Sequence, residues 1–363
     1  MQKHTYNVIG LMSGTSLDGL DIAFCKFEFL SNLKWNWEVL NSVTKNYAES
    51  LKYKLSESKN FNGLDLHTLD IELGKWMGES IKDFIAENKL NVDFIVSHGH
   101  TVFHVPEKQL TLQIGNPNFI HAITGKPIIS DLRSLDMAKG GQGAPLVPIG
   151  DALLFNEYDF CINLGGIANL SYENEENNRI AYDICACNIL LNALANLKEL
   201  EYDNKGRLAK SGNVIKSLLK EWDDFSFLKK KYPKSLGIEQ IEPEILSKID
   251  KEKYKIEDMM ATAIEHIASQ ISKTLISAKK EGKILKILLT GGGAFNDYLI
   301  ERLQSKLDEK YELMVADDKT VNYKEALIFA FLGVLNVRNE WNTLASVTGA
   351  HTNSISGQKL GDF

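Results

Sequence analysis

The sequence predicts an α/β protein built from two related domains. In the first hundred residues, apolar alternation and helical spacing predict three strands, a helix and a fourth strand, in that order. A unit of strand, glycine turn and strand occurs around Gly14 and again around Gly165, which is 165 − 14 = 151 residues later. The chain of 363 residues is longer than one ordinary domain. We therefore expect two similar domains, although a single pair of hairpins can also recur by chance.

The composition is that of a globular protein that dissolves in water. Hydrophobic residues make up 44% of the chain and charged residues 25%, and the net charge is −7. A negative charge does not favour nucleic acid as a partner, and no apolar stretch has the length of a membrane span. The first ten residues lack a signal-peptide pattern, and the four cysteines lack zinc spacing. We expect a cytoplasmic protein with reduced thiols and no membrane or nucleic-acid partner.

The first predicted hairpin, residues 7–27, has a turn suited to a phosphate. Between its two apolar strands lie residues 13–16, SGTS, which offer hydroxyls, backbone N–H groups and a glycine that permits close approach. Asp18 and Asp21 would repel a phosphate, but they fit if Mg²⁺ and its waters lie between carboxylate and phosphate. The alternative interpretation is an ordinary polar hairpin, in which the Asp-Gly pair at 18 and 19 supplies a turn.

The next segments are predicted to alternate between strands and helices. The expected elements are a strand at 35–44, helices at 47–60 and 64–88, a strand at 94–97, a helix at 118–124 and a strand at 127–130.

Two polar stretches follow predicted strands. Residues 97–106, SHGHTVFHVP, contain three histidines, but zinc sites add Cys or carboxylate ligands at characteristic spacing and none is evident. We expect a polar loop here, at the carboxyl end of a strand and facing a ligand. Residues 131–143 are expected to form a structured loop that lines a cleft, rather than a flexible linker between domains.

The second half of the chain repeats the plan of the first. The expected elements are a hairpin at 160–172, a strand from 179 that ends at Asp183, a helix at 189–200, a charged helical region at 201–258, a long amphipathic helix at 259–280, strands at 284–289 and 311–315, and a helix from about Lys324 to Val337. Glu325 would lie in the first turn of this last helix.

Three consecutive glycines, at 291–293, separate the predicted strand at 284–289 from a helix that begins near Asn296. Such a junction suits a nucleotide, because glycines let the chain lie flat against a base or ribose and the helix N-terminus carries positive dipole character. Close packing of helix against strand is another reason for glycine, and it is compatible with the first.

The three glycine turns occur in the order hairpin, hairpin, strand-to-helix. This order resembles the phosphate and adenosine motifs of the sugar kinase, Hsp70 and actin superfamily. More closely, the chain resembles the anhydro-N-acetylmuramic acid kinases along nearly its whole length. The similar stretches are GLMSGTSLDGLDIA (10–23), SHGHTVFH (97–104), DLRSLDMAKGGQGAPLVP (131–148), NLGGIANL (163–170), YDICACN (182–188), PKSLGIE (233–239), TGGGAFN (290–296), EALIFAFLG (325–333) and SVTGA (346–350). MSGTSxDGxD and GGQGAPLVP are long and specific motifs.

The chain departs from the usual pattern of this family at three places. SHGHT stands where the family reads SHGQT, so His100 replaces an amide side chain, and Ile238 stands where an Arg is common. The family's DTGPGN stands here as DICACN at 183–188, which keeps the acid and the Asn but lacks both glycines. That turn must follow a different path or keep φ negative throughout.

The resemblance implies a two-domain actin-like ATPase fold of the ribonuclease H-like type, with a nucleotide and sugar cleft between the domains. Residues 1–135 with the tail 340–363 are expected to form one domain, and residues 136–339 the other. The resemblance also implies a homodimer.

The reaction implied is that of an ATP-dependent kinase that uses ATP and Mg²⁺. Water opens the 1,6-anhydro ring of anhydro-N-acetylmuramic acid, and O6 takes the γ-phosphate, giving N-acetylmuramic acid 6-phosphate and ADP in peptidoglycan recycling. Two alternatives are a kinase for a simpler anhydrosugar such as levoglucosan, and a catalytically inactive sugar or nucleotide sensor on the same fold.

The matching motifs imply roles for individual residues. Asp183 is the expected general base, and Glu325 is expected to orient water or a sugar hydroxyl, or else only to stabilise its helix N-terminus. Arg133 is expected to pair with the lactyl carboxylate, or else with Asp131 or Asp136 as a loop contact. The residues expected to bind the sugar are His98, Arg133, Asp136 and Gln142. Those expected to bind the nucleotide are Ser13, Gly14, Thr15, Ser16, Leu17, Asp18, Gly19, Leu20, Asp21, Gly165, Gly166, Asn169, Gly291, Gly292, Gly293 and Asn296, with Asp18 as the metal ligand.

Overall fold

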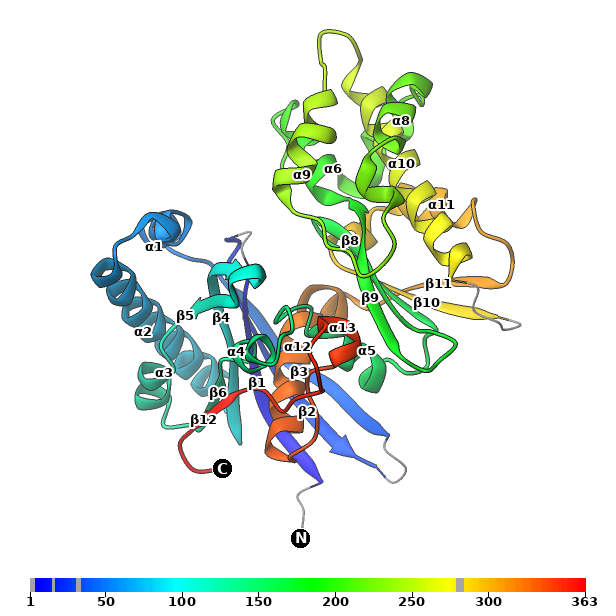
Figure 1. Cartoon of the computed structure of the whole chain (residues 1–363). Coiled ribbons are helices and arrows are strands. Elements are labelled where there is room, and N and C mark those ends of the chain that lie inside the picture. Colours follow the sequence, from blue (N-terminus) through cyan, green and yellow to red (C-terminus); the bar gives the residue numbers. More distant parts are fainter. Residues whose placement is uncertain (1–3, 15–16, 31–33, 279–283) are drawn as a thin grey trace. The chain divides into compact units, whose positions relative to one another are not determined.

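The computed structural model describes residues 4–14, 17–30, 34–278 and 284–363 (Figure 1). The chain forms two compact units, each with its own β-sheet. Unit 1 comprises Met1–Leu154 and Tyr323–Phe363, and unit 2 comprises Phe155–Asn322.

The units divide at Leu154 and Asn322, whereas the sequence suggested divisions at residues 135 and 339. Two buried contacts tie the segment after residue 135 to unit 1. Thr348 Oγ1 donates to Asp136 Oδ1 at 2.8 Å, and Lys324 Nζ lies 2.7 Å from Asp151 Oδ1 with both side chains almost completely buried.

Unit 1 is built on a seven-stranded sheet of order β12-β6-β4-β1-β2-β3, with β5 paired to β4. Strands β1, β2 and β3 are antiparallel neighbours, whereas β4 runs parallel to β1 and β6 runs parallel to β4. The strands are β1 (Thr5–Ser13), β2 (Leu20–Phe29), β3 (Trp35–Lys45), β4 (Phe94–Val105), β5 (Leu110–Ile114), β6 (Ile128–Ser130) and β12 (Gln358–Leu360).

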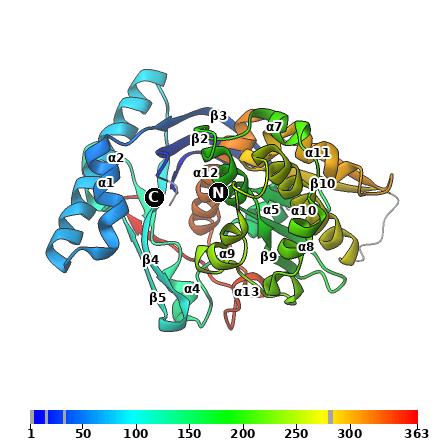
Figure 2. The same cartoon turned by 90° about the horizontal axis from the view of Figure 1, so that it is seen from above.

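Helices cover both faces of this sheet (Figures 1 and 2). On one face lies α2 (Gly63–Asn88), whose apolar residues from Leu69 to Phe84 recur at helical spacing and are buried in the core of unit 1. On the other face lies α12 (Asp318–Val337), packed so closely that a Cβ atom on Gly10 would lie 1.9 Å from Ala326 O. The other helices of unit 1 are α1 (Glu49–Glu57), α3 (Pro117–Thr124), α4 (Ser134–Ala138), α5 (Val147–Leu154) and α13 (Ala345–Thr348).

Unit 2 is built on a five-stranded sheet of order β11-β10-β7-β8-β9. Its strands are β7 (Phe160–Leu164), β8 (Ile167–Glu173), β9 (Arg179–Ala186), β10 (Leu285–Thr290) and β11 (Tyr311–Val315). Its core is centred on α10, and its helices are α6 (Asn188–Asn196), α7 (Arg207–Ser211), α8 (Lys216–Asp223), α9 (Ile238–Glu244), α10 (Ile256–Ser277) and α11 (Asp297–Gln304).

The two sheets share one topology. In each, three antiparallel strands are followed by two strands that extend the sheet in parallel on the other side of the first strand. This strand order is that of the ribonuclease H-like fold, and its duplication is that of actin-like ATPases. The expected fold class is confirmed, and the glycine turns at Gly14 and Gly165 both join the first strand of a sheet to the second.

Two strands are longer than the sequence predicted. β4 continues through residues 98–105, where we expected a polar loop, because the chain returns as β5 and pairs with it from His100 to Val105. β9 continues past Asp183 to Ala186, because β8 pairs with it as far as Ile167. The expectation that Asp183 ends its strand is therefore wrong.

The start of α12 also differs from expectation. The helix begins at Asp318 because Asp317 accepts hydrogen bonds from the backbone N–H and hydroxyl of Thr320, at 3.1 and 2.7 Å. Glu325 therefore lies in the third turn, not the first. A helix-terminal role for Glu325 is excluded, since that effect is confined to the first turn.

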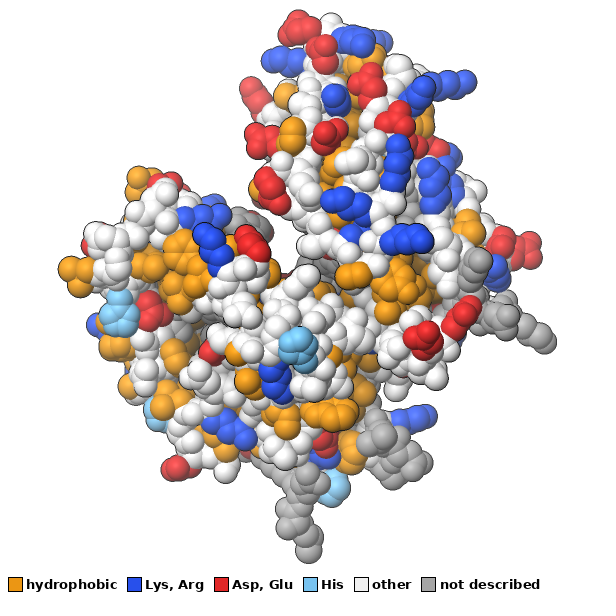
Figure 3. Space-filling model, viewed as in Figure 1, with side chains coloured by type: hydrophobic (Ala, Val, Ile, Leu, Met, Phe, Trp, Pro, Cys, Tyr) orange, Lys and Arg blue, Asp and Glu red, His pale blue; other side chains and the backbone are white. Residues whose placement is uncertain are grey.

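The surface of unit 2 carries acidic and basic side chains side by side (Figure 3). Across the part of the chain that the structure describes, no helix combines the length and the apolar character needed to cross a membrane. All four cysteines are described, and each is a buried free thiol.

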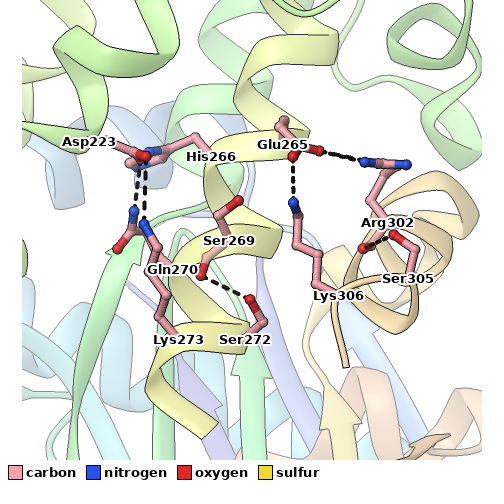
Figure 4. Close-up of polar contacts among 10 residues, drawn as sticks. All are labelled: Asp223, Glu265, His266, Ser269, Gln270, Ser272, Lys273, Arg302, Ser305 and Lys306. Carbon is pink, nitrogen blue, oxygen red and sulfur yellow. Dashed lines mark hydrogen bonds and ion pairs between the residues drawn. The ribbon is translucent and has the colours of Figure 1, made fainter. Parts of the chain in front are cut away.

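Polar side chains on both flanks of α10 tie it to its neighbours (Figure 4). Glu265 accepts from Arg302 Nη2 of α11 at 2.9 Å and pairs with Lys306. Burial alone would raise the pKa of Glu265, but the contacts with Lys306 and Arg302 outweigh it and the pKa is lowered. On the opposite flank, Asp223 accepts from His266 and Gln270 at 2.6 and 2.8 Å.

We expect Glu265→Gln to lower the free energy of unfolding by about 1–3 kcal/mol at pH 7, because it removes the charge that both cations contact. A carboxyl group with a lowered folded-state pKa stabilises the fold above its unfolded pKa of about 4.3 and loses this effect as the pH falls. The difference between variant and wild type should therefore shrink in urea titrations from pH 7 down to pH 3. Glu301→Gln, which breaks an exposed pair with Lys210, is the control and should leave the free energy of unfolding almost unchanged. An equal loss of unfolding free energy in Glu265→Gln and Glu301→Gln would contradict a stabilising role for the Glu265 contacts.

Candidate functional site

In unit 1, the turn after β1 is described at Gly14 and from Leu17 onward, so Thr15 and Ser16 lie outside the described residues. Leu17 has φ 60 and donates its N–H to Gly14 O at 3.3 Å. Gly19 has φ +152, and a Cβ atom there would lie 2.7 Å from Lys45 O, so this glycine is required by the chain path alone. Leu20 is buried in the core of unit 1.

The hydroxyl of Ser13, expected to face a phosphate, points inward. Its Oγ accepts from Tyr47 OH at 2.7 Å and lies 2.9 Å from His100 Nδ1, and all three side chains are buried. Ser13 is therefore part of the support for the turn, and the expected hydroxyl contact from it is wrong.

Two carboxylates follow the turn. Asp18 is exposed, and Asp21 accepts from Thr44 Oγ1 at 2.6 Å through Oδ1 only. Burial and the nearby charge of Asp18 raise the pKa of Asp21, against the hydrogen bond from Thr44. Two carboxylates that repel each other in this way suit a shared cation. No cluster of three or more His, Cys, Asp or Glu that could hold a metal occurs in the described ranges, so a cation here would need oxygen ligands from phosphate and water as well.

Arg133 is held firmly at the same end of the unit 1 sheet. Its Nε and Nη2 donate to His98 Nε2 at 3.0 and 2.8 Å, and its Nη1 donates to Gly143 O at 2.7 Å. His98 Nδ1 donates to Gly99 O, which fixes the tautomer that accepts from Arg133. Burial, with the charge of Arg133, lowers the pKa of His98 to about 3, so the imidazole is neutral.

The partner of Arg133 is thus a histidine, and the alternative pairing with Asp131 or Asp136 is wrong. Burial lowers the pKa of Arg133 to about 10, and the charge of Glu325 opposes this, so the guanidinium stays protonated at neutral pH. Two of its N–H groups remain for another acceptor.

Glu325 comes from α12, near Arg133 and Asp21. Desolvation by the surrounding protein raises the pKa of Glu325, although its side chain is exposed to solvent. Among the nearby charges, those of Arg133 and Lys324 act against this rise, and that of Asp21 adds to it. A carboxylate between two cations and another acid is placed to accept a hydrogen bond from water or a hydroxyl.

The loop at 131–143 is ordered, as we expected, but two of its residues have different places. Asp136 is completely buried and accepts from Gly143 N and Thr348 Oγ1, both at 2.8 Å. It cannot contact a sugar directly, and its function is to hold the loop. Gln142 donates its backbone N–H to Thr348 O at 2.9 Å and leaves its side chain exposed.

In unit 2, the sheet brings Asp183 and Asn169 directly opposite each other on β9 and β8. Asp183 Oδ2 accepts from Leu236 N at 2.8 Å and Ser235 Oγ at 3.2 Å. Burial raises the pKa of Asp183, while these two hydrogen bonds and the charge of Lys234 act against it. Both contacts use Oδ2, so Oδ1 is available to another partner.

The second glycine turn presents its carbonyl groups to the start of α6. Gly165 O accepts from Asn188 N at 3.1 Å, and Gly166 O accepts from Cys187 N at 2.9 Å. None of residues 184–187 has a positive φ; Cys187 has φ −126 and ψ −99. The DICACN segment thus keeps φ negative and does not need the glycines that it lacks. This is one of the two alternatives expected from the sequence.

A cavity of about 810 Å³ lies within unit 2, next to the three glycines after β10. Asn296, at one side of it, accepts from Leu299 N at 3.0 Å and so caps α11. Gly292 faces the cavity, since a Cβ atom there would have no neighbour closer than Asn188 Nδ2 at 3.6 Å. Gly291 and Gly293 instead pack against β7, where Cβ atoms would meet Asn163 Oδ1 at 2.3 Å and Leu164 Cβ at 2.8 Å.

The sequence prediction missed the opposite wall of this cavity. The lining includes Tyr202, Asp203 and Lys205, together with Asn192 and Phe295. Asp203 is held by accepting from Leu208 N and Ala209 N, both at 3.0 Å. No motif marks the segment at 202–205, which lies in a charged region, so no sequence signal pointed to it.

A family model described as anhydro-N-acetylmuramic acid kinase matches residues 6–360. The chain belongs to the anhydro-N-acetylmuramic acid kinase family. It is 35% identical over 364 residues to the protein of that name from Actinobacillus pleuropneumoniae serotype 7 (strain AP76), covering 96% of this chain and 97% of the relative. It is 32% identical over 378 residues to the protein of that name from Bacillus cereus (strain AH187), covering 96% and 98%.

Among solved structures, the chain is similar to the activator of the 2-hydroxyisocaproyl-CoA dehydratase from Clostridium difficile with bound ADPNP, at a TM-score of 0.45 and 15% identity, covering 92% of this chain and 97% of that one. For the hexokinase from Schistosoma mansoni complexed with glucose, the TM-score is 0.36 and the identity 8%, covering 91% and 85%.

Proposed function

We propose that the protein is an anhydro-N-acetylmuramic acid kinase. It opens the 1,6-anhydro ring with water and transfers the γ-phosphate of ATP to O6, giving N-acetylmuramic acid 6-phosphate and ADP in peptidoglycan recycling. The observation that carries this proposal is the match of the family model to residues 6–360, almost the entire chain. We also propose that the protein acts in the cytoplasm as a homodimer, which light scattering after gel filtration would test.

The proposed general base is Asp183. Its raised pKa makes it a stronger proton acceptor than an ordinary aspartate, and its backbone contact with Leu236 fixes the direction of the carboxylate. Oδ1 would take a proton from the water that attacks the anomeric carbon. The freed O6 would then attack the γ-phosphorus, and the bond to the β-γ bridging oxygen breaks as ADP leaves.

In unit 1, the residues proposed to act on the sugar are Arg133 and Glu325. Arg133 keeps two N–H groups for the lactyl carboxylate, and a planar guanidinium can bind it in a bidentate manner. Glu325 would accept a hydrogen bond from the attacking water or a sugar hydroxyl. His98 orients Arg133 through its neutral ring, so it is proposed to act through that contact.

Asp18 and Asp21 fit a magnesium site, because hard oxygen donors are what Mg²⁺ prefers and the two carboxylates repel each other without a cation. When bound, the ion would neutralise charge on the phosphates. Asp21 is held in place by Thr44, and Asp18 is exposed.

The nucleotide is proposed to enter the cavity of unit 2, with Gly292 against the adenosine. We expect Gly292→Val to raise the KM for ATP about tenfold or more, because its side chain would project into the cavity without meeting the fold. Thermal unfolding should change little. Gly293→Ala is the matched contrast, because its Cβ would strike Leu164 and lower stability instead. Unchanged ATP affinity in a folded Gly292→Val protein would show that the nucleotide does not bind in this cavity.

A single assay with the purified protein tests the proposed function. ADP release is followed with ATP and Mg²⁺ plus anhydro-N-acetylmuramic acid, with levoglucosan, and with no sugar, and the product mass is determined. We expect rapid ADP release only with the first sugar, and a product heavier by both water and phosphate. Turnover of levoglucosan alone would favour the simpler anhydrosugar, and ATP binding without any turnover would favour a sensor.

A further inference from the structure

Three buried side chains from different parts of unit 1 meet beneath the end of β1. Ser13 ends β1, His100 lies in the middle of β4, and Tyr47 lies between β3 and α1. They are 1%, 3% and 6% exposed, respectively. Ser13 Oγ lies 2.9 Å from His100 Nδ1 and 2.7 Å from Tyr47 OH. Water cannot readily replace a lost partner at this depth, so each hydrogen bond constrains the groups that make it.

The three groups form a continuous chain of hydrogen bonds at neutral pH. Burial raises the pKa of Tyr47 to about 12, so the phenol keeps its proton and donates to Ser13. Ser13 Oγ can donate its own proton to His100 Nδ1 or accept one from it, according to the tautomer of the ring. Burial lowers the pKa of His100 to about 4, so the imidazole is neutral at pH 7.

A bulge in β4 is what brings His100 to this place. Leu11 of β1 lies opposite Ser97, but Ser13 lies opposite His100, so β4 carries one extra residue over this interval. The extra residue is Gly99, with φ +75, where a Cβ atom would lie 2.8 Å from Ile114 O. His98 and His100, which a regular strand would place on one face, therefore turn to opposite faces.

The two histidines have separate tasks as a result. His98 lies against Phe329 of α12 and accepts from Arg133, whereas His100 faces the α2 side of the sheet and Ser13.

We propose that His100 is a positioning residue for the triphosphate of ATP. Through its hydrogen bond with Ser13, it fixes the carboxyl end of β1, and with it Gly14, which begins the turn expected to bind phosphate. The inference rests on the proposed function only in taking ATP as the ligand. A glutamine side chain can also accept or donate a hydrogen bond, so we expect the hydrogen bond, rather than the ring, to be the property required at this position.

The experiment compares His100→Leu, which removes the hydrogen bond with Ser13, with His100→Gln, whose amide can restore one. Binding of Mg-ATP and of adenosine is measured by calorimetry without sugar, because adenosine lacks the phosphates that the turn would position. His121→Leu is the control, since His121 is a partly buried histidine of unit 1 whose Nδ1 donates to the backbone carbonyl of Lys126. Circular dichroism and thermal unfolding verify that each variant is folded.

We expect His100→Leu to raise the Kd for Mg-ATP about tenfold, the effect of one lost buried hydrogen bond, while the Kd for adenosine changes less than about twofold. His100→Gln should lie within about threefold of wild type for both. An unchanged Kd for Mg-ATP in His100→Leu, an equal loss for both ligands, or a failure of Gln to restore affinity would each overturn the proposal.

Two further outcomes keep the test decisive. If His100→Leu does not fold, Tyr47→Phe replaces it, and it should weaken Mg-ATP about threefold with adenosine unchanged; no effect there overturns the proposal. The variants can show the expected changes in Kd although the wild-type protein does not phosphorylate the anhydrosugar. In that case the proposed function fails while the positioning role of His100 stands. A wild type that does not bind Mg-ATP refutes both.

Discussion

Asp183→Asn should reduce turnover by about 10²-fold or more while leaving the KM for ATP nearly unchanged. The size is that of a positioned general base, and the amide keeps the shape and can still accept from Leu236 N. The pH profile provides a second readout. Because burial raises the pKa of Asp183, the acid limb of kcat/KM should lie above the value of about 3.9 for an ordinary aspartate, and this limb should be absent from the residual activity of the variant.

Asp183→Asn should lower turnover, but it should not lower the stability of the fold. A carboxyl group whose folded-state pKa is raised favours the fold below its unfolded pKa and opposes it above, so ionised Asp183 costs stability at pH 7. Asp183→Asn should therefore unfold in urea at an equal or higher midpoint than wild type. Asp308→Asn, at a surface position paired with Lys310, is the control and should change neither property. Near-normal turnover in Asp183→Asn would remove Asp183 from the mechanism.

Arg133→Ala should raise the KM for anhydro-N-acetylmuramic acid by an amount equivalent to about 2–5 kcal/mol, or roughly 30-fold to several thousand-fold. The reason is that the lactyl carboxylate would lose its buried, charged partner. The comparison sugar is 1,6-anhydro-N-acetylglucosamine, which lacks the lactyl group. Steady-state kinetics on both sugars measure the coupling between this side chain and that group.

A loop role for Arg133 gives a different result. Its contacts with Gly143 O and His98 order the loop, so removal of Arg133 for that reason alone would harm both sugars equally. Arg133→Lys keeps a charge but loses the planar fork, and it should recover only part of the loss on the lactyl sugar. Equal losses on both sugars would reopen the levoglucosan alternative.

Regular elements could be predicted from the sequence wherever one face of an element is apolar. The helical spacing of Leu69, Leu73 and Met77 predicted α2 to within one residue, and β11 was predicted at its observed bounds. The polar stretch at 98–105 gave no such signal, because two of its histidines are buried by pairing with β5 and by a bulge. Burial of polar side chains depends on partners that a local pattern does not contain.

The motifs indicated which segments form the candidate site, but they could not show which side chains face a ligand. Ser13 and Asp136 both look like ligands in the sequence and both turn inward. Their partners are remote, since His100 is 87 residues from Ser13 and Thr348 is 212 residues from Asp136. Whether a polar residue supports the site or lines it was decided by these long-range contacts, and no pattern within a motif encodes them.

Unit 1 is formed by two segments of the chain with unit 2 between them, and this affects the order in which the units fold during synthesis. Unit 2 is one continuous stretch, Phe155–Asn322, whereas unit 1 needs residues from both sides of it. Domains fold as they emerge from the ribosome, so unit 2 is complete while unit 1 still lacks α12 and the strand β12 that pairs with β6. Until Thr348 has been synthesised, Asp136 lacks the hydroxyl that holds its loop. The loop that carries Arg133 is therefore among the last parts to be set in place, after the cavity of unit 2 has formed.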